Sequence, residues 1–453
     1  MKDLAKQEIL FLVVIVTLSF LLALFFYKGS GHPIKGDAQQ YNIIAQNLLR
    51  HRAYSLSPGP PYLPTTLREP GYAFFLAFLI WLFKGNYVAI YGTQVVLYLL
   101  TVVLVYYLSA KILGKGIARW VTLLTGLCPT LANYPGYLLS ETLFTFLIIL
   151  FMLAILRAVE VNRTAWYICS GLLLGLCALT KCITVLLFVP IAFCGVLYSG
   201  NINLFFRKYA KNFVIFVVTF LVIVAPWSIR NYAAFGKFSL SLHLGRVLLV
   251  RGAKLDYSLR DTKKEILFIL SEYLGKKFYP DVEEPNNFLL KEAIENEQQI
   301  KKMIGQGYNE VEINQIQIKQ ALVKIKRRPL KYLSQNFLEW FKMTAFLHIP
   351  LLSESDTIER FKDIKNGQLI LSAVRGVFRL AAYLTLFFAF FGFLSQGKKW
   401  RQWVFIAALI IYTNLTYSFL FGSGRYNVPL IPFYFMFAVA GFNFIKNKNK
   451  FVS

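Results

Sequence analysis

The chain has 453 residues, of which 57% are hydrophobic and 17% aromatic, and the hydrophobic residues fall in long runs rather than in a helical or strand alternation. Such runs are typical of membrane proteins, because a span of ~20 apolar residues crosses the hydrocarbon core with its backbone hydrogen bonds satisfied internally. A formal net charge of +26 can also indicate a nucleic-acid partner. The basic residues are sorted by loop, however, which favours an origin in membrane topology and no nucleic-acid partner.

The apolar runs predict an all-α, polytopic transmembrane fold with about 10 to 12 spans. The candidate spans are residues 9–27, 86–110, 116–136, 138–158, 165–182, 183–199, 212–229, 369–395, 403–421 and 426–445. With the N-terminus inside, every second short loop carries the basic excess that fixes the orientation of a membrane protein. The basic residues of these inner loops are Lys2, Lys6, Lys111, Lys115, Arg119, Arg157, Arg163, Arg207, Lys208, Lys211, Lys398, Lys399, Arg401, Lys446, Lys448 and Lys450.

These spans divide the chain into three regions. Residues 1–235 form a transmembrane module whose first outer loop, residues 28–85, contains an apolar stretch at residues 72–83. That stretch is too short for a span, and we predict a re-entrant or interfacial helix. Residues 236–368 form an outer-face helical loop, and residues 369–453 supply the last transmembrane helices and a basic cytoplasmic tail.

The outer-face loop is helical in its sequence pattern. Apolar residues recur at helical spacing beside polar faces in residues 294–307 and 310–329, which predicts two helices. The next run, residues 329–352, mixes aromatic residues with Lys331 and Lys342. It is typical either of a helix that lies on the membrane interface or of a further span.

The first outer loop contains a candidate catalytic carboxylate, Asp37. One apolar stripe of the helix predicted after it comprises Tyr41, Ile44, Ala45, Leu48 and Leu49. That stripe suits a helix lying on the membrane surface. Asp37 is followed three residues later by Gln40, so the pair also fits a capping box that needs no chemistry. Its expected position at the outer interface, where a lipid head group lies, favours a functional role.

Two charged residues stand directly before the predicted interfacial helix. Arg68 can hold a substrate phosphate through its planar guanidinium group, or it can extend to the phosphates of ordinary membrane lipids. Glu69 can belong to the same site, or it can serve only as a carboxylate at a helix start, where the helix dipole favours it.

Glu141 is predicted about one turn inside the outer end of the span at residues 138–158. Ionisable residues inside a span are costly and indicate a functional site, although pairing with a neighbouring arginine is the structural alternative. Several cations also gather at outer ends of spans, against the positive-inside trend, and they are Lys181, Arg230, Arg375, Arg379 and Arg425. Each alone can be a membrane anchor. Together with Asp37 and Glu141 on one face, they indicate an anionic lipid head group.

At these residues the sequence resembles the membrane-embedded glycosyltransferases of the GT-C superfamily that use lipid-linked donors, in particular the branch with protein O-mannosyltransferases and the lipid A aminoarabinose transferase. The resemblance covers most of residues 1–235 and returns at 403–445. It is carried by Asp37, the run R-x-P-G-Y at 68–72, the turn L-L-S-E ending at Glu141, PWSIRNYAAFGKF at 226–238 and RYNVPLIP at 425–432. The aminoarabinose branch has Glu-Lys-Pro-Pro at the position of residues 68–71, and the mannosyltransferases have Asp-Glu where Ala38 follows Asp37.

The resemblance implies that a sugar is displaced directly from a polyprenyl-phosphate carrier, with inversion, and transferred to a glycan, lipid or protein acceptor. It implies that Asp37 acts on the acceptor as a base or positioning group and that outer-face cations hold the carrier phosphate. The predicted site comprises Asp37 and Glu141 as catalytic carboxylates and, for phosphate or substrate binding, Arg68, Glu69, Lys181, Arg230, Arg425 and Tyr426. The resemblance also favours a bacterial inner membrane, with the site facing the periplasm or the outside.

Two other classes of protein remain as alternatives, a lipid-carrier flippase or transporter and a non-catalytic assembly subunit. Transporters favour inverted repeats and charges near the middle of the membrane, whereas the acidic residues here are expected at its outer margin. His32 and His51 have no suitably spaced partner and the five cysteines lie within or at the ends of predicted spans. No metal site is therefore predicted, and the sequence does not identify a cofactor.

Overall fold

The computed structural model describes residues 2–32, 34–280, 285–345, 349–353, 367–395 and 400–448. Within these ranges all regular structure is helical, which confirms the predicted all-α fold. The predicted inner-loop residues Lys398, Lys399 and Lys450, and part of the run at 329–352, lie outside the described residues.

The membrane-spanning bundle contains helices at all ten predicted spans. These helices are α1 (Lys2–Gly29), α4 (Tyr87–Leu113), α5 (Lys115–Gly126), α7 (Glu141–Val161), α8 (Thr164–Thr180), α9 (Phe188–Ser199), α11 (Ala210–Phe235), α20 (Gly367–Leu394), α21 (Trp400–Leu420) and α22 (Ile431–Lys448). In the described part of the chain, seven helices are long and apolar enough to cross a membrane, and α9 with α10 (Ile202–Lys208) forms a further pair bent by 107°. The chain is thus a polytopic helical membrane protein.

The predicted spans at 116–136, 165–182 and 183–199 are not among these seven, since α8 is a shorter apolar helix and α9 belongs to the bent pair. The run at 116–136 is broken, because α5 ends at Gly126 and Pro129 begins the short helix α6 (Pro129–Asn133). Proline has no backbone N–H and its ring excludes a preceding helical turn, so it marks the first turn of a new helix.

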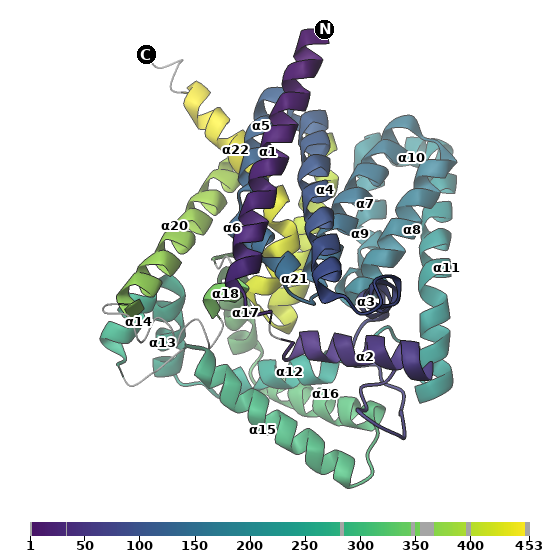
Figure 1. Cartoon of the computed structure of the whole chain (residues 1–453), viewed down its shortest axis with the longest axis vertical. Helices are drawn as coiled ribbons and strands as arrows, with labels where there is room; N and C mark the ends of the chain where they lie inside the picture. Colours follow the sequence, from purple (N-terminus) through teal and green to yellow (C-terminus); the bar gives the residue numbers. More distant parts are fainter. Residues whose placement is uncertain are drawn as a thin grey trace.

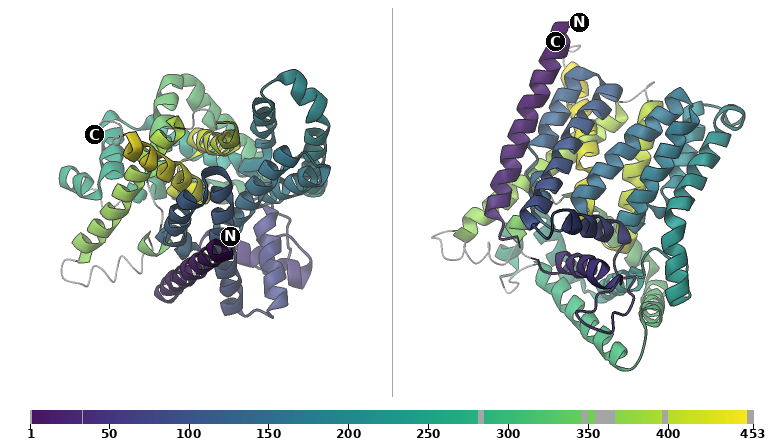
Figure 2. Two further views of the ribbon diagram at one scale, coloured as in Figure 1. Left: turned by 90° about the horizontal axis from the view of Figure 1, so that it is seen from above. Right: turned by 45° about the vertical axis from the view of Figure 1, so that its right-hand side comes forward.

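The helices of the two long loops gather at one end of the bundle, here called the loop end, and both chain termini lie at the other (Figures 1 and 2). The first loop contributes α2 (Asp37–His51) and α3 (Pro70–Leu82), which lie across the ends of the spans. This placement of α3 agrees with the predicted interfacial helix.

The apolar stripe of α2 faces protein rather than lipid over most of its length, contrary to expectation. Ile44 and Ala45 are fully buried, and the ring of Tyr41 meets the ring of Tyr72 on α3 edge to face, with centroids 4.9 Å apart. Of the predicted stripe, Leu49 at the far end is exposed. Packing against α3 therefore fixes the orientation of α2, and with it the direction of the side chains at its start.

The second long loop folds into a row of helices. They are α12 (Leu244–Ala253), α13 (Leu259–Leu270), α14 (Glu272–Phe278), α15 (Pro285–Gly305), α16 (Glu310–Arg327) and α17 (Pro329–Ala345). The two predicted helices at 294–307 and 310–329 are confirmed as α15 and α16. Helix α17, at the start of the run at 329–352, is not among the helices suited to crossing a membrane.

Candidate functional site

Asp37 lies at the start of α2 with its carboxylate turned toward basic side chains. Gly36, with φ of 57°, is the N-cap residue, and no side chain caps the helix. The capping box considered as an alternative for Asp37 and Gln40 is therefore excluded, because Asp37 lies one position inside the helix and both side chains bind arginine instead. Nη2 of Arg68 donates to Oδ1 of Asp37, while Nε of Arg68 donates to Oε1 of Gln40 at 2.6 Å.

A second arginine binds the other oxygen of the same carboxylate. Nη1 of Arg425 lies 2.6 Å from Oδ2 of Asp37. Burial alone would raise the pKa of Asp37, but the guanidinium groups of Arg425 and Arg68 outweigh it and hold the pKa well below its ordinary value. Burial also opposes the charge of Arg68, yet the Asp37 carboxylate prevails and raises the pKa of Arg68. The Asp37 side chain remains 31% exposed, so a substrate can reach it.

Arg425 bridges Asp37 to Glu141 at the start of α7. Its Nε donates to Oε1 of Glu141, and its Nη2 donates to Oε2 at 3.2 Å, a bidentate pair. Lys181 completes the chain with Nζ 3.0 Å from Oε1 of Glu141. The Glu141 side chain is fully buried. Of the two carboxylates, Asp37 is therefore the one that solvent can reach.

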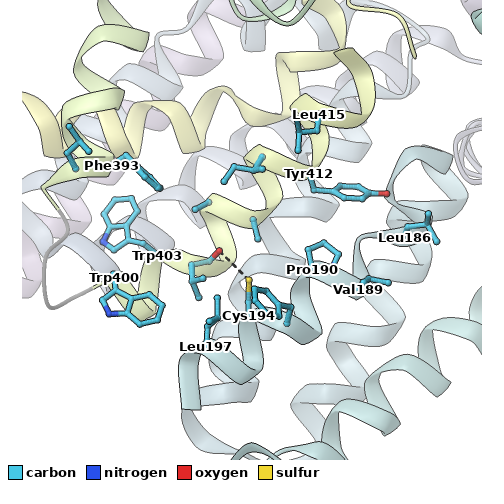
Figure 3. A pocket seen from close by; sticks show the side chains of 16 residues that line it. Leu186, Val189, Pro190, Cys194, Leu197, Phe393, Trp400, Trp403, Tyr412 and Leu415 are labelled. Atoms are coloured by element: carbon cyan, nitrogen blue, oxygen red, sulfur yellow. Dashed lines mark hydrogen bonds between the residues drawn. The ribbon is translucent and has the colours of Figure 1, made fainter. Parts of the chain in front are cut away.

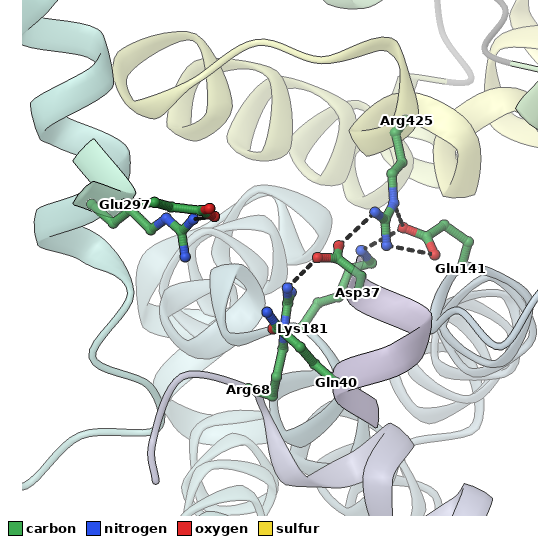
Figure 4. A network of polar contacts seen from close by, with 8 residues as sticks. Asp37, Gln40, Arg68, Glu141, Lys181, Glu297 and Arg425 are labelled. Atoms are coloured by element: carbon green, nitrogen blue, oxygen red, sulfur yellow. Dashed lines mark hydrogen bonds and ion pairs between the residues drawn. The ribbon is translucent and has the colours of Figure 1, made fainter. Parts of the chain in front are cut away.

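These contacts form one continuous series, here called the ion-pair chain (Figure 4). Its members, in order, are Gln40, Arg68, Asp37, Arg425, Glu141 and Lys181. The three cations and two carboxylates of the ion-pair chain carry a net charge of +1, and the nearby carboxylate of Glu69, whose charge also acts on Arg68, offsets it.

Close helix packing explains how the sequence brings Arg68 near Lys181. Gly71, in the first turn of α3, lies against the end of α8, where an added Cβ would be 2.8 Å from the carbonyl oxygen of Leu179 and 2.7 Å from Oγ1 of Thr180. Lys181 follows directly as the C-cap residue of α8. The glycine of the R-x-P-G-Y run thus permits the approach of the two cations' backbones.

The turn before Glu141 is fixed by a buried amide. Nε2 of Gln94 on α4 donates to the carbonyl oxygens of Pro135 and Tyr137, at 3.0 and 2.8 Å, and its Oε1 accepts from the hydroxyl of Tyr72 at 2.9 Å. One side chain therefore joins α3, α4 and the turn that leads into α7.

The remaining predicted site residues lie around the ion-pair chain without joining it. Tyr426 stacks on Tyr417, with ring centroids 4.4 Å apart, and Nζ of Lys181 lies 5.8 Å from the centroid of its ring. Glu69 is the N-cap residue of α3 and has no side-chain capping bond. Its carboxylate lies close enough to the thiol of Cys182 to interact with it electrostatically.

Arg230 holds loop backbone rather than the ion-pair chain. Its guanidinium donates to the carbonyl oxygen of Thr65 at 3.0 Å and lies 4.9 Å from the centroid of the Trp227 ring. It therefore fastens the first loop to α11.

Sequence reasoning missed several polar residues that shape this end of the molecule. Oε1 of Glu310 accepts from the hydroxyl of Thr65 at 2.7 Å, which joins α16 to the first loop. The imidazole of His243, just before α12, has a buried Nδ1 with no hydrogen-bond partner in the described structure. Burial and then the charge of Arg68 lower its pKa to about 4. The capping box at Asn309 was a detectable local signal for α16, whereas no local pattern marks His243.

An apolar cavity of about 1070 Å³ lies between α9 and α21 (Figure 3). The hydroxyl of Tyr412, on its wall, donates to the carbonyl oxygen of Ile183 at 2.6 Å, two residues beyond Lys181. Leu186 and Leu415 also line this end, and Trp400 lines the other. The cavity thus extends along the bundle from the neighbourhood of the ion-pair chain toward the end that bears the termini.

Within the described ranges, no group of three or more His, Cys, Asp or Glu side chains is placed to hold a metal ion. The predicted site residues that do come together are acidic and basic side chains, which suits proton transfer and the binding of an anion.

Part of the chain matches a known protein family. Residues 64–229 match a family model described as dolichyl-phosphate-mannose-protein mannosyltransferase. No match was found among curated protein sequences.

Similar solved structures come from two kinds of protein. An Archaeoglobus fulgidus oligosaccharyltransferase, tethered with an acceptor peptide containing the NVT sequon, matches with a TM-score of 0.50 at 11% identity, over 96% of this chain and 50% of that one. ArnT from Cupriavidus metallidurans, bound to undecaprenyl phosphate, matches with a TM-score of 0.42 at 14% identity, over 97% and 78%. The chain spans about half the length of the oligosaccharyltransferase. Residues 64–229 therefore resemble that family, as the sequence motifs predicted, and the chain shares the fold of the oligosaccharyltransferase.

Proposed function

We propose that the protein transfers a sugar from a polyprenyl-phosphate carrier to a hydroxyl group of a glycan, lipid or protein at the loop end. The ion-pair chain is the observation that carries this proposal. It combines an accessible carboxylate with three cations in one connected network. The family match over residues 64–229 supports a lipid-phosphate donor, since the description of that family names dolichyl-phosphate mannose.

Arg68, Arg425 and Lys181 are the proposed phosphate ligands. The guanidinium groups offer planar pairs of donors that match phosphate oxygens, and the ammonium group adds a point charge. As the bond from the anomeric carbon to the phosphate oxygen breaks, its electron pair stays on that oxygen. The three cations stabilise this developing charge.

Asp37 is the proposed base. It takes the proton of the acceptor hydroxyl while the acceptor oxygen forms a bond to the anomeric carbon from the face opposite the leaving phosphate, so the configuration inverts. Fully buried Glu141 acts through Arg425 and Lys181, which it holds in position. Glu69, Arg230 and Tyr426 complete the surroundings of the substrate.

The same contacts suggest how the donor activates the base. A carboxylate held between two guanidinium groups has a low pKa and is a weak base. A carrier phosphate that competes for Arg68 and Arg425 weakens both ion pairs of Asp37 and raises its pKa. Basicity then increases only when the donor is bound.

The apolar cavity between α9 and α21 is the proposed site of the carrier's hydrocarbon chain. Its walls are apolar. At one end, the lining residue Tyr412 is hydrogen-bonded to Ile183, which is two residues after Lys181 in the sequence. A polyprenyl chain in this cavity would place its phosphate at the loop end, beside the cations.

Purified protein in liposomes tests the proposal. We would supply undecaprenyl phosphate linked to labelled mannose or glucose on one leaflet and separate labelled acceptor from labelled lipid. Label in a new acceptor product, lost in Arg425→Ala, supports transfer. Label that only changes leaflet would establish the flippase or transporter, and label that stays on its own lipid and leaflet would favour an assembly subunit.

The charge sorting of the loops supports a site on the outer side of the membrane. The resemblance further supports a bacterial inner membrane, with the loop end in the periplasm. Reaction of single cysteines introduced at Lys35 and Lys446 with a membrane-impermeant maleimide in whole cells would test this orientation, and labelling of Lys446→Cys alone would overturn it.

A further inference from the structure

A second cluster of buried charges lies in the long loop, away from the ion-pair chain. Nζ of Lys254, in the short 3₁₀ helix η3 (Lys254–Asp256), contacts Oε1 of Glu339 on α17, and both residues are 1% exposed. The same ammonium group donates to Oε1 of Glu265 at 2.7 Å. Burial alone would raise the pKa of Glu339, but Lys254 and Lys342 outweigh it and hold the pKa at about 2. This carboxylate is therefore ionised at physiological pH.

The other oxygen of Glu339 holds the chain segment that carries Arg425. Oε2 accepts from the backbone N–H of Gly422 at 2.8 Å. An added Cβ at Gly422 would lie 2.4 Å from the carbonyl oxygen of Glu339, so the two backbones are in close contact. Seven residues before Glu339 on α17, the hydroxyl of Tyr332 donates to the carbonyl oxygen of Phe419, near the end of α21. Helix α17 is therefore hydrogen-bonded both to the last turn of α21 and to the segment that follows it.

Arg425 lies three residues after Gly422, near the start of the 3₁₀ helix η5 (Gly424–Leu430). The backbone N–H of Tyr426 donates to the carbonyl oxygen of Ser423 at 2.9 Å, so Ser423 to Tyr426 form a tight turn that contains Arg425 and directly follows Gly422. A displacement of Gly422 is consequently passed on to Arg425 rather than absorbed.

Lys254 is itself anchored in the long loop. Nε2 of Gln335 donates to its carbonyl oxygen at 2.7 Å, and fully buried Arg251 donates to Oε1 of Gln335 at 2.9 Å. The position of α12 and η3 is thus linked through α17 to Gly422.

Buried ion pairs are weak evidence for stability, because dehydration offsets the attraction and an apolar pair of similar volume is often as stable. The hydrogen bond from Gly422, by contrast, needs a charged or polar acceptor at position 339. This contrast separates a role in stability from a role in positioning.

We propose that the Lys254–Glu339 pair is a positioning unit that sets Arg425 between Asp37 and Glu141 and thereby makes the grip on the carrier phosphate depend on the docking of residues 244–345. Glu339 and Lys254 are positioning residues, since neither belongs to the ion-pair chain. The inference rests on the proposed function because it takes a lipid phosphate as the ligand of Arg425. Its structural half, the fixing of residues 422–425, does not depend on that function.

The test compares wild type with Lys254→Met/Glu339→Met, which removes both charges together and so avoids an unpaired buried charge. Glu339→Gln serves as the partial variant, because its amide oxygen can still accept from Gly422. The control is Lys111→Gln/Glu160→Gln, which removes an ion pair of 2.7 Å between the last turns of α4 and α7, outside the long loop. Each protein is purified in detergent and checked by thermal unfolding.

Two quantities are measured. Hydrogen exchange of the amides at 421–427 reports the position of the segment, and native mass spectrometry with undecaprenyl phosphate reports phosphate binding. We expect the double methionine variant to exchange about tenfold faster and to bind about tenfold more weakly. Glu339→Gln should lie between it and wild type, and the control should match wild type.

The outcomes separate the two claims. Unchanged exchange in a folded double methionine variant would overturn the positioning unit whatever the ligand. Faster exchange with unchanged affinity for undecaprenyl phosphate would overturn the dependence of the phosphate grip on the loop. A wild-type protein with no affinity for undecaprenyl phosphate would contradict the proposed function, while the exchange result would still decide whether residues 422–425 are held by Glu339.

Discussion

At the scale of single residues, the proposed base Asp37 also has a structural role. Its two ion pairs, with Arg68 and Arg425, hold together segments from the two ends of the chain. The resulting low pKa keeps the group ionised at physiological pH and leaves it a weak base until the arginines are otherwise engaged.

Asp37→Asn tests the chemical part of this role. The amide cannot accept a proton, and general-base assistance contributes about 10²- to 10⁴-fold in rate, so turnover should fall by that order. Binding of undecaprenyl phosphate should be kept, because the variant removes a competitor for the arginines. The comparison is with Glu295→Gln on the exposed surface of α15. Full turnover by the Asp37 variant would contradict the assignment.

His243 gives a pH dependence of stability with a defined sign. Burial, and next the charge of Arg68, lower its pKa from 6.5 to about 4 in the folded protein. The folded state therefore disfavours the imidazolium. Its stabilising contribution is complete above pH 6.5 and is lost as the pH falls through the window down to about 4.

We therefore expect His243→Gln to reduce the loss of thermal stability between pH 7.5 and pH 4.5. Since the glutamine does not titrate, its Tm should fall less than that of wild type by about 2 °C or more in detergent. His51→Gln, at an exposed ring stacked on Tyr62, is the matched control and should follow wild type. Parallel curves for wild type and His243→Gln would show that the buried imidazole does not titrate in this window.

At the scale of elements, the start of α3 shows that the role of a sequence motif depends on what its residues pack against. The R-x-P-G-Y run places a proline in the first turn and a glycine where α3 meets the end of α8. The contact lies beside Lys181, so helix packing and site geometry are determined by the same few atoms.

Gly71→Ala should therefore disturb both stability and the site. Its Cβ would lie 2.8 Å from the carbonyl oxygen of Leu179, which forces the two helices apart at a cost of roughly 1–3 kcal/mol. We expect a lower Tm and weaker binding of undecaprenyl phosphate. Gly92→Ala in α4 is the control, because an added Cβ there has no atom within 4 Å. If the two variants have the same Tm and the same affinity for undecaprenyl phosphate, the close contact at Gly71 does not contribute to stability or to the site.

The whole molecule is organised so that a polar site at the loop end adjoins an apolar cavity along the bundle. Arg425 and α21 belong to the last part of the chain, whereas Asp37 and α9 belong to the first. The site and the cavity are therefore both completed by the return of the C-terminal helices to the N-terminal module.

Filling the cavity tests its proposed occupant. Ala408→Phe adds a ring to the cavity wall on α21, so it should reduce affinity for undecaprenyl phosphate but affect farnesyl phosphate much less. The expected loss is about tenfold, which corresponds to a few buried methylene groups. Val96→Phe, at an exposed position of α4, should leave both affinities unchanged. If Ala408→Phe leaves the chain-length preference unchanged, the hydrocarbon chain lies elsewhere.

Sequence reasoning located the helices and the charged residues of the site, because both depend on local properties. Length and apolarity decide whether a run of residues forms a buried helix in a membrane protein, and the cost of a charge inside a span singles out Glu141. At Asp37 it left two alternatives, a capping box and a functional carboxylate, and only the structure excluded the capping box. A shift of one residue in the helix start, with Gly36 at the N-cap, changed the direction of that side chain.

What only the tertiary structure decided is which of these charges meet. Arg425 pairs with Asp37 across 388 residues and with Glu141 across 284, and no local pattern records such distances. The buried pair of Lys254 and Glu339 went unnoticed for the same reason. Helix formation is specified by neighbours in the sequence, whereas the pairing of buried charges depends on how the helices pack, and the packing of this chain is completed only by its last helices.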